Sequence, residues 1–202
     1  MNPAMETTLP EAVAPTRALR LRQATHAAHE MVDQTIMRAR PFAAVENYGT
    51  FLKVQYAFHR DVLPLYSRAD LLALIPDLGR RSRLDAVMQD AADLNIALPS
   101  LDNSPATDRE MSVAEALGWL YVIEGSNLGA AILFKAALKM GLSEEHGARH
   151  LAQAPEGRAE QWRNFTSALN AVELSAGDET AAVAGAEAAF EAVNAYVRQY
   201  MP

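Results

Sequence analysis

The spacing of hydrophobic residues predicts helices along almost the whole chain. Apolar residues recur three and four positions apart in successive stretches, and the period-two alternation of a half-buried strand never persists. The predicted helices cover residues 16–37, 45–66, 69–74, 81–94, 112–140, 156–173 and 179–200. Residues 95–109, which include Pro99 and Pro105, are expected to form a loop. The pattern therefore predicts an all-α bundle.

Helix-end signals support these boundaries. Thr16 follows a proline and is a good N-cap, and Pro41 disfavours helix in the residue before it. Ser112 and Glu115 have the spacing of a capping box, in which each side chain bonds the backbone N–H of the other residue. Gly141 is expected to end the same long helix.

One domain accounts for the chain length. A chain of 202 residues fits a single hydrophobic core, and no glycine- and serine-rich linker divides it. Residues 1–15 contain no apolar run and are expected to be a flexible tail, without the features of a secretory signal. The helical domain is therefore expected to span residues 16–202.

The first predicted helix presents a histidine on a mostly apolar face. Residues three, four and seven positions apart share a helix face, and here they are Arg22, Thr25, His29, Val32 and Ile36. A neutral imidazole is a good axial ligand for heme iron, and a cation two turns earlier can pair with a propionate. A core histidine bonded to a neighbour is the commoner explanation of this spacing, and His26 competes for the ligand role.

The long helix at 112–140 contains an unusual stripe of glycines. Gly118, Gly125 and Gly129 share a face with Tyr121, and Ser126 lies beside it. Each interior glycine costs a helix about 1 kcal/mol relative to alanine. Close packing against another helix is one reason to keep them, and it is favoured on the pattern alone. Close approach of a flat ligand is the other.

Composition excludes several classes of function. The net charge is −7, whereas nucleic-acid binders normally carry a basic face. Cysteine is absent, which excludes disulfides, thiolate metal sites and cysteine nucleophiles. None of the five histidines follows Asp or Glu by three positions, so the Glu-x-x-His pairs of di-iron carboxylate bundles are missing. The longest apolar stretches are shorter than a membrane span, so a cytoplasmic protein without membrane contact is expected.

Several motifs together resemble the bacterial heme oxygenases. The most specific is ALGWLYVIEGSNLGAAILFK at 116–135, followed by GARHL at 147–151 and by Gly157, Arg158 and Trp162. The first helix contributes Thr25-x-x-x-His29-Glu30. The similarity extends from about Arg17 to Tyr200.

The resemblance implies both a fold and a reaction. In this family heme lies between a proximal first helix and a glycine-kinked distal helix, and it is both cofactor and substrate. With O₂ and electrons from an external donor, such as a ferredoxin or a flavoprotein reductase, it is cleaved to biliverdin, CO and ferrous iron.

The resemblance also assigns roles to particular residues. His29, not His26, becomes the axial ligand of the heme iron, with Thr25 on the same heme-binding face. The distal contacts are Gly125 and Gly129, with Ser126 beside the ring. Arg22 and Tyr121 correspond to positions that hold propionates. The residues that resemble those ordering distal water are Gln55, His59 and Arg83.

The same comparison suggests which ring edge is cut. Most family members produce the α isomer of biliverdin. One bacterial variant rotates the heme, using lysines where this chain has Met37 and Ala136 and lacking the Arg22 and Tyr121 found here. The α isomer is therefore expected. The alternatives are a heme carrier or sensor on the same fold and a thiaminase-like enzyme, whose branch relies on a cysteine that this chain does not have.

Overall fold

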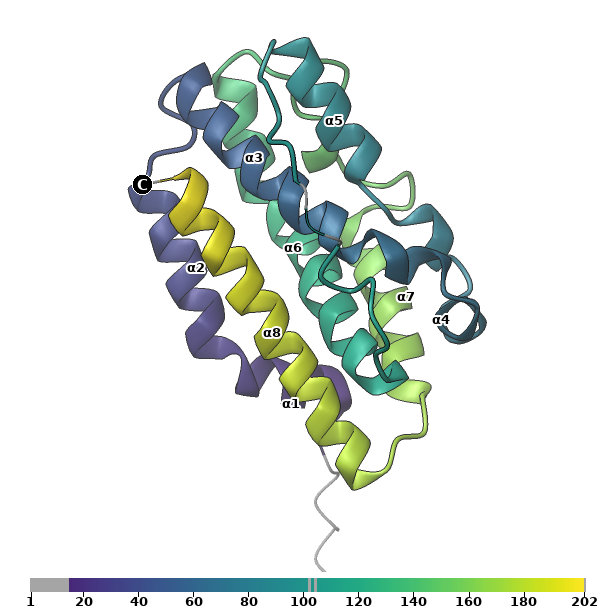
Figure 1. Ribbon diagram of the computed structural model, residues 1–202. Coiled ribbons are helices and arrows are strands. Elements are labelled where there is room, and N and C mark those ends of the chain that lie inside the picture. Colours follow the sequence, from purple (N-terminus) through teal and green to yellow (C-terminus); the bar gives the residue numbers. More distant parts are fainter. Residues whose placement is uncertain (1–14, 102, 104, 202) are drawn as a thin grey trace, which may run out of the picture.

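Helices make up the whole framework of the protein, as predicted (Figure 1). The structure is a computed structural model and describes residues 15–101, 103 and 105–201. The predicted tail at 1–15 lies almost entirely outside these residues. In chain order the elements are α1 (Arg17–Ala24), α2 (His26–Arg38), α3 (Val45–Val62), the 3₁₀ helix η1 (Leu63–Ser67), α4 (Ala69–Leu74), η2 (Leu78–Arg80), α5 (Leu84–Asp93), α6 (Val113–Lys139), η3 (Arg149–Leu151), α7 (Arg158–Ala171) and α8 (Ala176–Tyr200). Within the described residues there is no strand, only isolated bridges near Ser143.

Helix α8 is the central packing partner. It contacts α6 most extensively and also α3, α2 and α1, and in Figure 1 it lies between α2 and the α3–α6 pair. The α6–α8 contact is close because two glycines meet there. A Cβ added to Gly118 would lie 2.1 Å from the carbonyl oxygen of Ala182, and one added to Gly185 would lie 2.2 Å from that of Glu115. The packing explanation is therefore correct for Gly118.

The first predicted helix is in fact two helices. Thr25, with φ −99° and ψ 5°, separates α1 from α2. Its hydroxyl donates a 2.8 Å hydrogen bond to the carbonyl of Leu21, a local bond with which threonine competes against regular helix geometry. The prediction of one continuous helix over 16–37 is wrong at this point. The break also buries Thr25 and occupies its hydroxyl.

Thr16 caps α1 as predicted, whereas the predicted capping box at Ser112 was half correct. Ser112 accepts a 3.1 Å bond from the backbone N–H of Glu115, but the Glu115 carboxylate pairs with Arg109 instead of returning the bond. A reciprocal capping box forms instead at Ser175 and Asp178. That box starts α8 at residue 176, three residues before the predicted start.

Two further segments differ from their predicted extent. Residues 63–67 form the 3₁₀ helix η1 rather than the end of α3, because Pro64 lacks the backbone N–H that an α-helix needs. Residues 81–83 precede α5, which starts at Leu84 after the short turn η2. Helix α6 runs unbroken through its three glycines to Gly141, whose φ of +84° ends it as predicted.

Helix α6 is also the most hydrophobic helix. Of the helices that the structure describes, it is the one long and apolar enough to cross a membrane by length and composition. However, 56% of that apolar window is buried inside the protein, and α6 contacts α8, α7, η3, α3 and α1. Its hydrophobicity is therefore that of the core helix of a folded domain.

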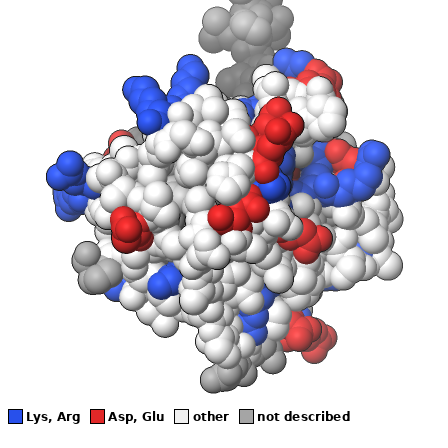
Figure 2. All heavy atoms as spheres, turned by 90° about the horizontal axis from the view of Figure 1, so that it is seen from above, with Lys and Arg blue, Asp and Glu red and all other residues white. Residues whose placement is uncertain are grey.

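Charged residues are mixed on the face shown in Figure 2. Lys and Arg side chains lie there in separate groups among Asp and Glu, with uncharged surface between them. This face therefore has no continuous basic area of the kind that follows a nucleic-acid backbone.

Candidate functional site

His29 projects from α2 with one ring nitrogen held and the other free. Its Nδ1 lies 3.3 Å from a carboxylate oxygen of Asp33, and its ring makes an edge contact with Phe190 of α8, with centroids 5.9 Å apart. The side chain is 60% exposed, and Nε2 has no protein partner within the described residues. A metal-bound histidine is commonly fixed in this way, by a carboxylate on the nitrogen that does not bind.

His26 has the opposite arrangement. Its Nε2 is the nitrogen that faces a carboxylate, 3.6 Å from Glu30, and its side chain is 70% exposed. Neither histidine is a core residue, so the commoner explanation of the sequence spacing is wrong for both. Across residues 15–101, 103 and 105–201, no group of three or more Asp, Glu or His side chains could hold a metal ion.

Gly125 and Gly129 are not explained by packing. A Cβ added to Gly129 would meet nothing within 4 Å, and one added to Gly125 would make ordinary contact with Trp162 at 3.7 Å. Ile132, on the same stripe of α6, is 75% exposed. This part of α6 therefore presents a flat, apolar and uncovered face, which a planar apolar ligand could approach closely.

Arg22 and Tyr121 mark one end of this face. Helix α1 contacts α6, and the positive charge of Arg22 is close enough to oppose the rise in the pKa of Tyr121 that burial causes. In the described part of the chain neither side chain has a hydrogen-bond or ion-pair partner. From this end α2, which carries His29, and α6, which carries Gly129, run in the same direction (Figure 1).

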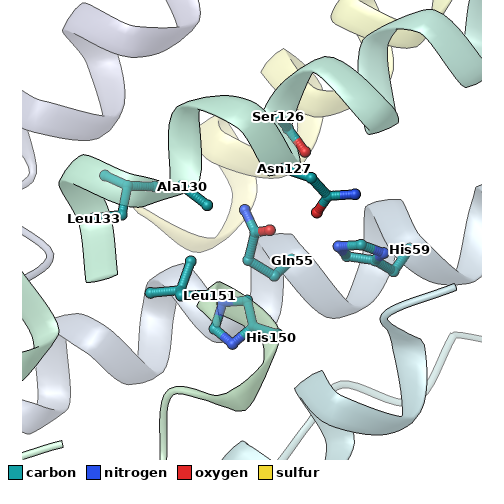
Figure 3. Close-up of a pocket in the computed structure, with 8 residues that line it drawn as sticks. All are labelled: Gln55, His59, Ser126, Asn127, Ala130, Leu133, His150 and Leu151. Atoms are coloured by element: carbon teal, nitrogen blue, oxygen red, sulfur yellow. The ribbon is translucent and has the colours of Figure 1, made fainter. Parts of the chain in front are cut away.

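A small cavity lies between α3 and α6, and we call it the α3–α6 cavity (Figure 3). It has a volume of about 40 Å³ and is lined by Gln55, His59, Ser126, Asn127, Ala130, Leu133, His150 and Leu151. Three buried atoms that line it have no hydrogen-bond partner in the structure: His59 Nδ1, Asn127 Nδ2 and His150 Nε2. One ordered water needs about 10–15 Å³ and two to four polar partners, so the cavity suits bound water.

The structure brings some predicted residues together and separates others. Gln55, His59 and Ser126 all line the α3–α6 cavity. Arg83 does not: it lines an open cleft of about 900 Å³ between the start of α5 and the loop before α7. Its charge nevertheless contributes to lowering the pKa of His59. Thr25 is also set apart, because its hydroxyl is bonded to the α1 backbone.

Sequence reasoning missed two polar residues of the cavity, Asn127 and His150. Both lie within the motifs that carry the family resemblance, at 116–135 and 147–151. Their place beside the glycine stripe and in GARHL was the available signal. Neither had a stated role because a sequence does not show which polar atoms end up buried without a partner.

A buried ion pair anchors α6 just before Gly125. Glu124 accepts a 2.8 Å bond from Arg81 Nη1 and a 3.2 Å bond from the Tyr66 hydroxyl. Burial raises the pKa of Glu124, and the charge and hydrogen bond of Arg81 oppose that rise. The pair holds this turn of the helix against α5 and the 3₁₀ segments, so Gly125 is presented from a fixed backbone.

The buried His59 should make the protein sensitive to acid. Burial, assisted by the charges of His150 and Arg83, lowers its pKa to about 3. The unfolded chain then binds the extra proton first, so stability is complete above about pH 6.5 and falls as the pH drops toward 3. We expect His59→Gln to reduce the loss by up to about 1.4 kcal/mol per pH unit, as measured by urea unfolding between pH 7 and pH 4.5. An equal loss of unfolding free energy in the wild type and in His59→Gln would contradict this assignment.

Comparison with known proteins identifies the family. The heme oxygenase family model matches residues 16–199. Heme oxygenase PigA of Pseudomonas aeruginosa is 42% identical over 187 residues, which cover 92% of this chain and 94% of that protein. A heme oxygenase of Xanthomonas campestris is 33% identical over 110 residues, covering 54% of this chain and 64% of its own.

Solved structures agree with this result. The NO- and CO-bound heme oxygenase of Neisseria meningitidis superposes with a TM-score of 0.87 at 43% identity, with 93% of each chain covered. The heme oxygenase of Leptospira interrogans, at 17% identity and a TM-score of 0.71, supports the fold alone. The match covers the helices that present His29 and the glycine stripe. The chain belongs to the heme oxygenase family, whose members are oxidoreductases, as its sequence motifs predicted.

Proposed function

We propose that this protein binds heme against α2 and α6 and uses O₂ and reducing equivalents to cleave it to biliverdin, CO and ferrous iron. The observation that carries the proposal is the face of α6 at Gly125 and Gly129, where no backbone packs closely and Gly129 is open. These residues weaken the helix without any packing return, which fits a site where a flat ring must approach the backbone. We further propose that the heme-binding domain is residues 16–202.

His29 is proposed as the axial ligand. Its Nε2 is free and its Nδ1 faces Asp33, so the ring is oriented to donate its lone pair. Bound heme would supply both the iron that activates O₂ and the ring that is oxidised. Arg22 and Tyr121 are proposed to bind the propionates, since a guanidinium and a phenol hydroxyl both donate hydrogen bonds to carboxylates.

The α3–α6 cavity is proposed to deliver protons through ordered water. Gln55 and Ser126 line it with polar groups, and the lowered pKa of His59 keeps that imidazole neutral at physiological pH. A neutral side chain that positions water gives a milder proton source than a charged acid, and the donors of the distal pocket decide how bound O₂ reacts. Arg83 is proposed to act on this cavity through its charge, from the neighbouring cleft.

The external partner is proposed to be a ferredoxin or a flavoprotein reductase in the cytoplasm. The chain contains no cysteine for an iron–sulfur cluster of its own, which fits electrons supplied by an external donor. The absence of cysteine also fits a protein that does not depend on an oxidising compartment.

The predicted product is mainly the α isomer of biliverdin. Arg22 and Tyr121 are both present and close enough to interact, whereas Met37 and Ala136 stand where the heme-rotating variant uses lysines. A propionate anchored at the Arg22 end fixes how the ring is turned about its normal. Chromatography of the extracted product measures this directly, and a mainly β or δ product would show that the ring sits in the rotated orientation.

Hemin titration followed by reduction tests the function. One equivalent of hemin should give the absorption band of a histidine-ligated heme, and ascorbate in air should convert it to a biliverdin spectrum. A band that forms but persists, even with a ferredoxin and its reductase supplied, would favour the alternative function of a heme carrier or sensor. Failure to form any band would refute the heme site itself.

A further inference from the structure

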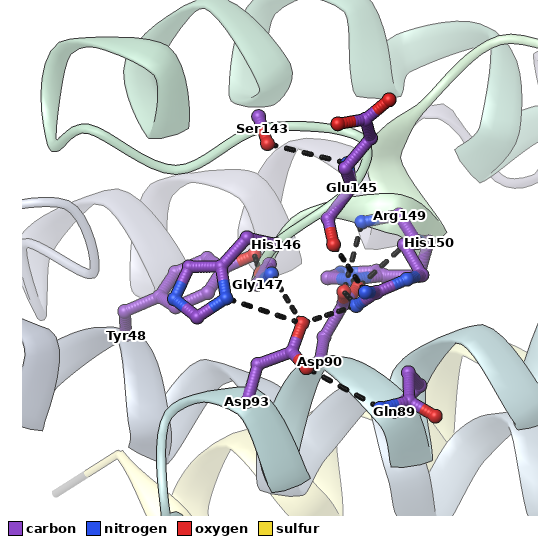
Figure 4. Close-up of polar contacts among 10 residues, drawn as sticks. All are labelled: Tyr48, Gln89, Asp90, Asp93, Ser143, Glu145, His146, Gly147, Arg149 and His150. Atoms are coloured by element: carbon purple, nitrogen blue, oxygen red, sulfur yellow. Dashed lines mark hydrogen bonds and ion pairs between the residues drawn. The ribbon is translucent and has the colours of Figure 1, made fainter.

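A buried aspartate and histidine lie directly behind the α3–α6 cavity. His150 of η3 and Asp90 of α5 are both almost fully buried, and Asp90 Oδ2 lies 2.7 Å from His150 Nδ1 (Figure 4). Oδ2 also accepts the backbone N–H of His150 at 2.9 Å. Oδ1 accepts the backbone N–H of Arg149 at 2.9 Å and its guanidinium at 3.1 Å. Three N–H donors and the His150 Nδ1 therefore converge on one carboxylate.

This arrangement defines the tautomer of His150. An ionised carboxylate only accepts hydrogen bonds, so the His150 Nδ1 must carry a proton and donate a hydrogen bond to Asp90. Burial lowers the pKa of His150, although Asp90 opposes that change, and Arg83 adds to the lowering. The ring is thus neutral, and its Nε2 holds a lone pair rather than a proton.

The free nitrogen belongs to a ring that lines the cavity. His150 lines it together with Gln55 and His59, and the ring lies at the floor of the pocket in Figure 3. Its Nε2 is buried and has no protein partner in the structure. A buried acceptor left without a donor is unfavourable, whereas water in a cavity of this size can satisfy it.

We propose that His150, fixed by Asp90, is a positioning residue whose Nε2 accepts a hydrogen bond from ordered water in the α3–α6 cavity and thereby sets the direction of the water chain. The catalytic part of this inference rests on the proposed function, but the tautomer and the water contact do not. No role for Asp90 or His150 follows from the family resemblance.

A fixed acceptor gives the chain of water molecules a direction. The water that donates to His150 turns its lone pairs toward the remaining donors of the cavity. One of these donors is the side-chain amide nitrogen of Asn127 on α6, which also has no protein partner. Asn127 adjoins Ser126 in the same helix as the glycine face. Each water between the two residues then donates toward η3 and accepts from the side of α6. This arrangement leaves fewer alternative orientations than a cavity lined by hydroxyls alone.

The heme-free protein provides the first test. Nitrogen-15 NMR of the labelled protein should show His150 with a protonated Nδ1 and an unprotonated Nε2, and a high-resolution crystal structure should show water within hydrogen-bond distance of Nε2. A protonated Nε2, or a cavity without water, would overturn the proposal. Both readouts are independent of heme turnover.

Three variants provide the second test. His150→Phe removes the acceptor, His150→Gln can restore one through its amide oxygen, and His146→Gln is the matched control. His146 lies in the same loop but is 58% exposed and faces Asp93 instead of the cavity.

We expect His150→Phe to bind hemin with unchanged affinity but to open the ring about tenfold more slowly, with a larger solvent deuterium isotope effect. His150→Gln should recover part of the rate, and the control should match the wild type. An unchanged rate and isotope effect in both His150 variants would contradict the positioning role. If His150→Phe does not fold, the comparison of His150→Gln with the control still decides.

These outcomes are distinguishable from failure of the proposed function. If the wild type binds heme but never consumes it, the enzyme proposal fails, while the NMR and crystallographic results still decide whether His150 orients water. If the wild type turns over and His150 has the opposite tautomer, only the present inference fails.

Discussion

Replacing His29 with alanine is expected to remove the histidine-ligated heme spectrum and lower the rate of heme cleavage about a hundredfold or more. The Nδ1 of His29 lies 3.3 Å from Asp33, which leaves its Nε2 available, whereas in His26 it is Nε2 that faces a carboxylate. Since changing even the residues that orient a metal ligand costs about 10–100-fold, loss of the ligand should cost at least as much. Hemin titration and ascorbate turnover measure both effects.

His26→Ala is the matched control. The two histidines are three residues apart and similarly exposed, but the Nε2 of His26 faces Glu30. We expect this variant to keep the wild-type spectrum and rate. If it loses them while His29→Ala retains them, His26 is the ligand and the assignment from the family resemblance is wrong. Added imidazole should partly restore the spectrum of His29→Ala, because it can enter the space left by the ring.

The same substitution should have opposite effects at two glycines of α6. Gly118→Ala would place a methyl group 2.1 Å from a backbone oxygen of α8, so we expect a loss of about 3 kcal/mol in the free energy of unfolding. Gly129→Ala meets nothing within 4 Å and should gain about 1 kcal/mol from better helix propensity. Urea unfolding of the heme-free variants measures both changes.

Hemin affinity is the second property to measure for Gly129→Ala. Because the proposed ring position lies against the open face of Gly129, the stabilised Gly129→Ala variant should bind hemin about tenfold more weakly, by steric overlap worth about 1.4 kcal/mol. A variant that gains stability and loses no affinity would show that the face is not the heme contact. Destabilisation of both variants would mean that Gly129 has a packing partner after all.

The helical fold was predictable because its signals are local. Hydrophobic period, prolines and caps lie within a few residues of the effect they cause, and the all-α prediction was confirmed. The break at Thr25 was not predictable, because a threonine inside a helical pattern can either continue the helix or bond the backbone, as it does here with Leu21. Similarly, Glu115 had two available partners, and the neighbouring Arg109 was not part of the capping pattern.

The site was predictable only in part, for a different reason. Three glycines on one stripe look identical in sequence, yet α8 packs against Gly118 while nothing packs against Gly129. The difference depends on where α8 crosses α6, which is a long-range property. The family resemblance likewise placed Arg83 near the α3–α6 cavity, but its side chain lines the neighbouring cleft. The family resemblance supplied the residues, and the placement of their side chains required the fold. Their catalytic roles stay predictions.

Helix α6 is held unequally along its length. Its first half is held by the glycine contact with α8 and by the buried Arg81–Glu124 pair, while the second half exposes Leu128, Ile132 and Leu138. Local opening costs least where few apolar contacts cover the backbone, so backbone amides beyond Gly125 should exchange with solvent sooner than those before it. The first half of this continuous helix thus preserves the fold, while the more exposed face of its second half can yield to a ring entering and to a larger, bent product leaving.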